Sequence, residues 1–225
     1  GLWMSRDEGR TWTHPLTVPV FALTKVGDLW VLGTEDGTRL AVDERRWIDV
    51  EDGTEGVGFA DLLTRAGGVL GATDTGLSWS EDGESWVRRA RVDGGVGRLA
   101  GERDGDDLVW LVGPRGLFRT MDQGVTVERV GHFLASGIES VVRLGPAHAL
   151  ATGNGTVVET TDGGRSWHPF DTGLPAFEGG RLFQAGDGLY FADGGTLFRA
   201  RAIRHEEQPE ETFVDDDAYA ELAAS

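Results

Sequence analysis

Aspartate recurs along this chain within one short phrase, and repeated carboxylates are candidates for acid–base chemistry. The phrase reads Ser/Thr-x-Asp-x-Gly-x-Ser/Thr-Trp and is complete at residues 5–12 and 160–167. A copy at 80–86 is one residue shorter, a copy at 120–127 lacks the tryptophan, and an eroded copy spans 41–47. We refer to these segments as the repeated phrase. Its aspartates and tryptophans are Asp7, Trp12, Asp43, Trp47, Asp82, Trp86, Asp122, Asp162 and Trp167.

The residue types of the repeated phrase have a structural explanation that needs no catalysis. A carboxylate between a hydroxyl residue and a glycine can accept hydrogen bonds from the backbone of its own turn, and the glycine adopts a conformation that other residues avoid. The tryptophan that follows is a large apolar group at the start of the next strand. Because a fold has one active site and not five, we expect these aspartates to hold turns and not to act as acids or bases.

The segments between the phrases define the unit of the fold. In residues 97–127 we expect strands at 97–100, 107–112 and 117–120, then the phrase and a fourth strand at 126–130. The same order recurs over 20–50, 58–90 and 138–170, and a last set has three strands at 181–184, 189–192 and 196–202. Four antiparallel strands repeated about every 40 residues are typical of an all-β protein, the β-propeller, in which each blade packs against two neighbours.

Composition agrees with such a fold and excludes several classes of function. The chain has 225 residues, 35 glycines and no cysteine, so it has many tight turns and no disulfide or thiolate metal site. Its net charge of −17 argues against nucleic acid as a partner. No apolar stretch is long enough to cross a membrane, and no signal peptide is present in this sequence. The scattered histidines have no metal spacing, and we expect neither a metal nor a cofactor.

The repeated phrase resembles that of the Asp-box or BNR-repeat propellers over residues 1 to about 202. That family includes sialidases, xyloglucan-cleaving glycosidases, the sortilin-type receptor domain and the photosystem II assembly factors of the Hcf136 type. The resemblance implies that the phrase lies between the third and fourth strands, on the face away from any catalytic centre. It also favours a location outside the cytoplasm.

The blade count has two solutions. Residues 1–5 and 12–16 are expected as a third and a fourth strand with no first or second strand before them. If the strands at 181–192 complete that blade, the ring closes with five blades. If strands upstream of residue 1 are missing, the ring has six or seven blades, and we favour this second alternative. We expect the propeller over 1–204 and an acidic tail over 205–225, either exposed or docking through a short helix that Asp215 could cap.

The candidate binding residues lie in the loops that propellers direct toward the central channel. The loops between second and third strands carry Asp36, Asp74, Arg115 and Asp193, and two first strands begin with Arg98 and Arg181. Because guanidinium groups bind carboxylates through paired hydrogen bonds, the arginines are candidates for binding a carboxylate ligand. In the alternative, each arginine only offsets a nearby acid at a solvated surface.

We therefore expect no catalytic residue, and a scaffold that binds a protein, a glycan or another macromolecule through the channel face. The alternative is a glycoside hydrolase of the sialidase-like group, which would need two facing carboxylates such as Asp36, Asp74 or Asp193. The Phe-Arg-Ile-Pro signature of sialidases is absent. Their tyrosine nucleophile would have to be Tyr190, which is expected in mid-strand as a packed aromatic. The sequence does not indicate an oligomeric state.

Overall fold

Among the residues that the computed structural model describes, every element is a β-strand, and these strands form six antiparallel sheets. The structure describes residues 1–41, 46–101, 107–130, 137–170, 173–185 and 188–200. The first sheet has β1 (Leu2–Met4) and β2 (Thr13–Leu16), and the second has β3 (Ala22–Val26), β4 (Leu29–Gly33), β5 (Thr38–Ala41) and β6 (Trp47–Val50). The third has β7 (Phe59–Arg65), β8 (Gly68–Thr73), β9 (Gly76–Ser80) and β10 (Val87–Arg91).

The remaining sheets continue the same pattern. The fourth has β11 (Arg98–Ala100), β12 (Val109–Gly113), β13 (Gly116–Thr120) and β14 (Glu128–Val130). The fifth has β15 (Ile138–Arg143), β16 (Ala149–Gly153), β17 (Thr156–Thr160) and β18 (His168–Pro169). The sixth has β19 (Arg181–Ala185), β20 (Gly188–Asp193) and β21 (Thr196–Arg199). Within the described residues, no helix is long and apolar enough to cross a membrane.

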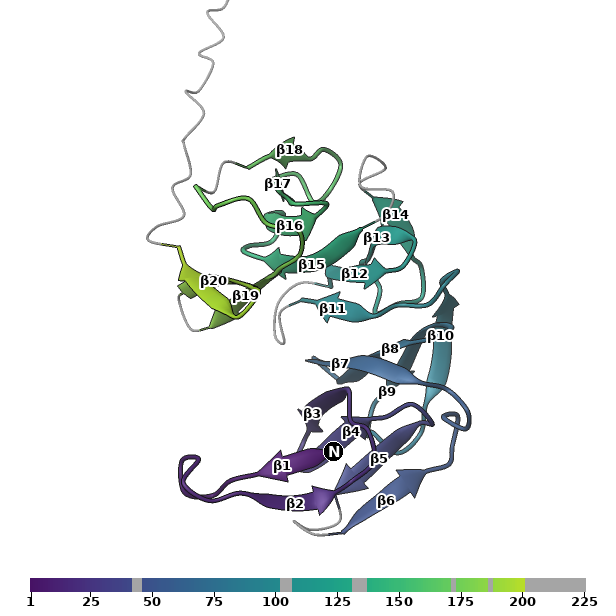
Figure 1. Cartoon of the computed structure of the whole chain (residues 1–225). Helices are drawn as coiled ribbons and strands as arrows, with labels where there is room; N and C mark the ends of the chain where they lie inside the picture. Colours follow the sequence, from purple (N-terminus) through teal and green to yellow (C-terminus); the bar gives the residue numbers. More distant parts are fainter. Residues whose placement is uncertain (42–45, 102–106, 131–136, 171–172, 186–187, 201–225) are drawn as a thin grey trace, which may run out of the picture.

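The sheets are arranged as the blades of a β-propeller, which confirms the predicted fold class. In each sheet the strands pair in sequence order. The first strands β7, β11, β15 and β19 lie beside one another, and Figure 1 shows them on the inner side of an open arc. The outermost strands β6, β10, β14 and β18 lie on its convex side (Figure 1).

The predicted strand order is correct, and the strand boundaries either coincide, as for 38–41 and 47–50, or differ by one to a few residues. The strand expected at 107–112 runs over 109–113, for example, and the one expected at 20–23 runs over 22–26. The sheet of β1 and β2 is separate from that of β19–β21, so the described strands do not form a five-bladed ring through pairing of 1–16 with 181–192. The eroded Asp43 and the segment 205–225, with its expected helix at Asp215, lie outside the described residues.

The hydrophobic core is a series of apolar layers between neighbouring blades. Trp86 contacts Phe59 edge-on at 4.8 Å between ring centroids, in the layer that joins β3–β6 to β7–β10. Trp167 contacts Trp110 in the same manner at 5.4 Å, in the layer that joins β11–β14 to β15–β18. Trp167 therefore packs against the blade before its own. Trp86 packs on Phe59 of its own blade, in a cluster that also holds Val31 and Leu40 of the blade before it.

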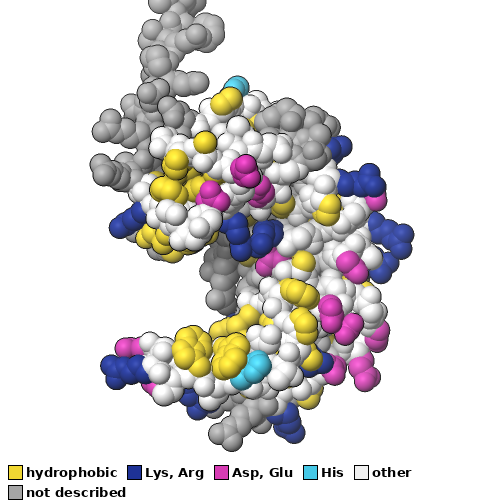
Figure 2. Space-filling view, in the orientation of Figure 1, with side chains coloured by type: hydrophobic (Ala, Val, Ile, Leu, Met, Phe, Trp, Pro, Cys, Tyr) yellow, Lys and Arg dark blue, Asp and Glu magenta, His cyan; other side chains and the backbone are white. Residues whose placement is uncertain are grey.

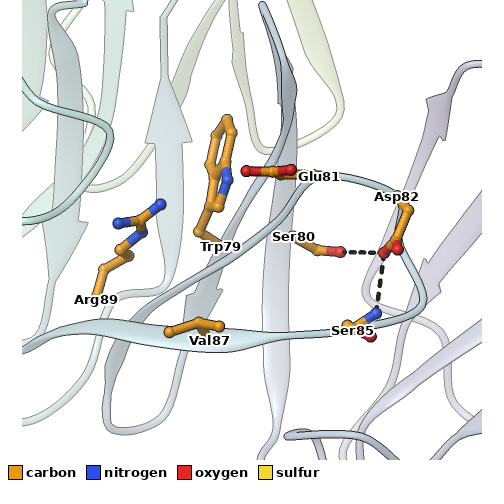
Figure 3. Close-up of a pocket in the computed structure, with 7 residues that line it drawn as sticks. All are labelled: Trp79, Ser80, Glu81, Asp82, Ser85, Val87 and Arg89. Atoms are coloured by element: carbon orange, nitrogen blue, oxygen red, sulfur yellow. Dashed lines mark hydrogen bonds between the residues drawn. The ribbon is translucent and has the colours of Figure 1, made fainter.

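The aspartate of the repeated phrase accepts hydrogen bonds from both ends of its turn. The Asp162 carboxylate accepts one from the Thr160 hydroxyl at 2.9 Å, and the Ser166 hydroxyl and backbone N–H donate to it at 2.6 and 3.0 Å. Thr160 in turn accepts from the N–H of Gly164 at 2.8 Å. In the shorter phrase, Figure 3 shows Asp82 between Ser80 and Ser85 in the same role as acceptor. These bonds tie the end of the third strand to the start of the fourth.

The same hydrogen bonds favour the ionised form of these carboxyl groups. The Thr11 side chain and backbone N–H donate to Asp7 and lower its pKa to about 2. Burial alone would raise the pKa of Asp162, but the hydrogen bonds from Ser166 and Thr160 outweigh it, so the pKa lies below the ordinary value of 3.8. The charged form of each aspartate is thus the one that stabilises its turn.

Because the pKa of Asp162 is lowered on folding, this group contributes stability above pH 3.8, and that contribution is lost as the pH falls below this value. We expect Asp162→Asn to lower the melting temperature most at neutral pH, with a gap to the parent that narrows below pH 4. Thermal melting followed by circular dichroism from pH 7 to pH 2 measures the gap. A gap that stays constant across this range would contradict the assignment.

Replacing Trp167 with alanine removes the large side chain between two blades. Because Trp167 is buried against Trp110, we expect the free energy of unfolding to fall by about 3 to 5 kcal/mol. The control is His168→Ala at the neighbouring exposed position, where we expect a change within about 0.5 kcal/mol. Urea denaturation measures both variants, and equal midpoints for them would show that the layer does not depend on the tryptophan.

Candidate binding site on the inner face

The first strands of four blades line a cavity of about 410 Å³ on the inner side of the arc. The strands contribute polar groups from β7, β11, β15 and β19, and these include Asp61, Arg98, Ser140, Arg143, Arg181 and Gln184. Figure 2 shows basic side chains gathered on this inner rim next to acidic ones. Because the lining comes from several rigid strands, the position of each group is set by the packing of the blades.

Two of the guanidinium groups in this cavity affect each other electrostatically. Partial burial lowers the pKa of Arg98, and the positive charge of Arg181 lowers it further. The nearby Asp61 carboxylate acts in the opposite direction and does not outweigh them. Arginine stays protonated at any physiological pH, so the cavity is lined by two positive charges, on the half-buried Arg98 and on the exposed Arg181.

Asp61 connects two blades. Its carboxylate oxygens accept hydrogen bonds from the backbone N–H of Leu62 and of Leu99, both at 2.9 Å. Burial raises the pKa of Asp61 in spite of these bonds and of the arginines nearby. Ser140 makes the equivalent connection two blades further on, where its hydroxyl accepts from the N–H of Leu182 at 2.9 Å. The main role of Asp61 is thus to join β7 to β11.

A second, more open depression of about 390 Å³ adjoins this cavity through Ala60 and Gly97, which neighbour Asp61 and Arg98 in the chain. Two carboxylates, Glu35 and Asp74, line it together with the exposed ring of Phe21. Both carboxylates are exposed to solvent. A catalytic acid is usually held in a desolvated place that keeps it protonated, so this geometry suits the binding of a polar ligand better than proton transfer.

The structure separates the six residues that the sequence singled out. Arg98 and Arg181 line the inner cavity, and Asp74 lines the depression next to it. Arg115 is exposed and forms an ion pair with Asp93 at 3.0 Å. Asp36 is exposed on the turn between β4 and β5, and the half-buried Asp193 ends β20. The predicted arginine cluster thus consists of two arginines at one cavity and a third that is paired elsewhere.

Four lining residues were not found from the sequence: Asp61, Ser140, Arg143 and Gln184. Asp61 and Ser140 lie within first strands, where a single polar residue resembles any solvent-facing position. The feature that distinguishes these two residues is a hydrogen bond to the next blade, and the sequence does not reveal which residues form it. Arg143 ends β15 and donates to the backbone carbonyl oxygens of Gly145 and Leu108 at 2.9 and 3.2 Å, so it holds backbone together.

Comparisons with known proteins support the fold alone. No family model matches the chain, and no curated protein matches it. Among solved structures, an ancestral GH74 enzyme matches with a TM-score of 0.67 at 14% identity. The match covers 88% of this chain and 33% of the enzyme's chain. YCF48 from Cyanidioschyzon merolae matches with a TM-score of 0.63 at 17% identity. The match covers 87% of this chain and 72% of the YCF48 chain.

The extracellular domain of a putative one component system, BT4673, from B. thetaiotaomicron has a TM-score of 0.66 at 14% identity. The match covers 86% of this chain and 29% of that domain. This chain therefore spans about a third or less of two of these three proteins. They include an enzyme and proteins of other kinds, so the similarity supports the propeller fold and leaves the function open.

The link that Asp61 makes can be tested by two substitutions of different severity. Asp61→Ala leaves the N–H groups of Leu62 and Leu99 without their acceptor, and we expect the free energy of unfolding to fall by about 1 to 3 kcal/mol. Asp61→Asn keeps one acceptor oxygen, so its free energy of unfolding should fall by less than that of Asp61→Ala. Urea denaturation of both variants checks this order, and an alanine variant as stable as the parent would show that Asp61 does not join the blades.

Proposed function

We propose that this protein is a non-enzymatic propeller scaffold that binds an acidic segment of a partner protein on the inner face. The observation that supports the proposal is the pair Arg98 and Arg181, which line one cavity and repel each other there. Asp61 offsets them only in part, because it carries at most one negative charge against their two positive charges. A carboxylate ligand would relieve the repulsion and accept charge-assisted hydrogen bonds from both guanidinium groups.

The shape and charge of the site favour a peptide carboxylate over a polyanion. The cavity of about 410 Å³ holds one or a few side chains of a ligand. The net charge of −17 repels acidic molecules at long range, so binding depends on the local pair of arginines. The adjoining depression, with Phe21, Glu35 and Asp74, gives polar and aromatic contacts for residues that flank the acidic segment.

A glycoside hydrolase needs two carboxylates that face each other across the scissile bond. The described residues that line the inner cavity include one carboxylate, Asp61, which is engaged by backbone. Glu35 and Asp74 share the open depression in an exposed setting. A binding scaffold is therefore the function that this geometry supports best. The test below also assays hydrolysis of glycosides, which would contradict this function.

The test measures binding of a short fluorescent peptide that carries one or two glutamates to the full chain by fluorescence anisotropy. We expect Arg98→Gln and Arg181→Gln each to weaken binding about tenfold, as for the loss of one charge-assisted hydrogen bond. The control is Arg115→Gln, since Arg115 is paired with Asp93 outside the cavity and should bind as the parent does. Added salt should weaken binding to the parent, because the contact is electrostatic.

Two results would overturn the proposal. Equal losses of binding affinity in all three arginine variants would show that binding depends on the charge of the whole surface and not on the cavity. Turnover of chromogenic glycosides by the parent, lost in Asp74→Ala, would favour the glycosidase. We expect no turnover by either protein.

A further inference from the structure

One copy of the repeated phrase differs from the others in its hydrogen bonds. In three copies, the last hydroxyl residue of the turn donates to the second carboxylate oxygen of the aspartate at 2.6 to 2.7 Å. These residues are Thr11, Thr126 and Ser166, each four positions after its aspartate. In the copy at 80–86 the turn is one residue shorter, so Ser85 follows Asp82 by three positions and only its backbone N–H reaches the carboxylate.

The shorter turn leaves two polar groups unengaged. Each hydrogen bond that the described residues donate to Asp82 ends on Oδ1. The donors are the Ser80 hydroxyl at 3.1 Å and the backbone N–H groups of Glu84 and Ser85 at 2.8 and 3.0 Å. Within the described part of the chain, neither Asp82 Oδ2 nor the Ser85 hydroxyl has a partner. The N–H of Ser85 lowers the pKa of Asp82, so this carboxylate is ionised at neutral pH.

A cavity of about 300 Å³ lies beside these two groups. Its lining residues are Trp79, Ser80, Glu81, Asp82, Ser85, Val87 and Arg89. Figure 3 shows Asp82 and Ser85 at one side of it and Arg89 at the other, with the Trp79 ring between them. We call it the phrase cavity. It shares no lining residue with the inner cavity, so it is a separate place on the molecule.

Arg89 is placed at the phrase cavity by a β-bulge. The register of β10 against β9 shifts between Arg88 and Ala90, so Arg89 is the extra residue. Bulges re-aim side chains, and here the guanidinium carbon lies 5.9 Å from the centre of the Trp79 ring. The Nε atom of Arg89 is buried without a hydrogen-bond partner. A buried donor without an acceptor is costly, and a ligand that brings an acceptor would remove that cost.

The charges of the phrase cavity favour a neutral ligand. The exposed carboxylates of Glu81 and Asp82 repel an anion, and Arg89 repels a cation. The groups that remain to be satisfied are two carboxylate acceptors and one guanidinium donor. A primary amide has two N–H donors and one carbonyl acceptor and carries no net charge, so it matches this set. The methylene groups of a glutamine would contact Val87, which is 61% exposed.

We propose that the phrase cavity binds the side chain of a glutamine residue in a partner protein. The amide N–H groups donate to Asp82 Oδ2 and to Glu81, and the amide carbonyl oxygen accepts from Arg89. Charge-assisted hydrogen bonds at both ends fix the orientation of the amide. The cavity is at the lower end of the size range for small-ligand pockets, so it holds one side chain while the partner backbone stays at the exposed rim.

The test uses N-acetyl-glutamine-N-methylamide and its glutamate and lysine analogues, added to the full chain labelled for nuclear magnetic resonance. The signal of the Trp79 indole N–H reports binding, and its loss in Trp79→Phe assigns it. We expect the glutamine probe to bind with a Kd of about 1 mM, as for a ligand of this size. Both charged analogues should bind at least about tenfold more weakly, because each meets a like charge in the cavity.

Two variants test the roles of the side chains. Arg89→Met keeps an apolar stem and removes the guanidinium, so we expect it to bind the glutamine probe about tenfold more weakly. Glu81→Ala removes one acceptor and should also weaken binding. The control is Arg88→Met, since Arg88 pairs with Ser78 on the face of the sheet opposite to Trp79, and it should bind as the parent does.

Three results would overturn the proposal. They are equal affinities for the three probes, equal losses in Arg89→Met and Arg88→Met, and a shift of the Trp79 signal by maltotriose at a lower concentration than by the glutamine probe. The last result would show that the cavity takes a sugar. If Arg89→Met melts at a lower temperature than the parent, Glu81→Ala decides, because Glu81 is exposed and its loss leaves the fold intact. Unchanged binding in that variant would then contradict the proposal.

Discussion

The packing of one blade on the next is the interaction on which the rest of this structure depends. A four-stranded sheet has two apolar faces and cannot bury either one alone. Here the burial comes from a glycine that lets the turn approach its neighbour closely and a tryptophan that fills the space beside it. Gly164, for example, has a positive φ of 87° and no room for a Cβ against Trp110. The aspartate holds this glycine and tryptophan in place through hydrogen bonds within the turn.

The position of the inner cavity is a consequence of that packing. Once neighbouring blades are fixed, their first strands lie side by side, and polar residues on them can reach across. Asp61 and Ser140 do so by accepting N–H groups of the next blade. Arg98 and Arg181 then face one cavity although 83 residues separate them along the chain. The charge of the site is therefore set by strand order, and not by any local motif.

This explains why the sequence predicted the fold better than the site. The repeated phrase and the alternation of short apolar runs are local signals, so the strand order and the place of each turn followed directly. Arg98 and Arg181 were recognised because each begins a first strand, where the loops meet the channel. Arg115 was grouped with them by the same reasoning, but its pairing with Asp93 depends on loop geometry that no local pattern encodes. Asp61 was missed because its partner, Leu99, belongs to another blade.

Identical local structure can thus have opposite environments in one chain. Trp12 and Trp86 make the same hydrogen bond within the same phrase, yet one is exposed and the other buried. The difference lies in the neighbour, since Trp86 has a preceding blade that covers it. The turn chemistry fixes the shape of each phrase before any blade packs on it. The shape of the turn is therefore a local property of the phrase, whereas the burial of its tryptophan depends on the neighbouring blade.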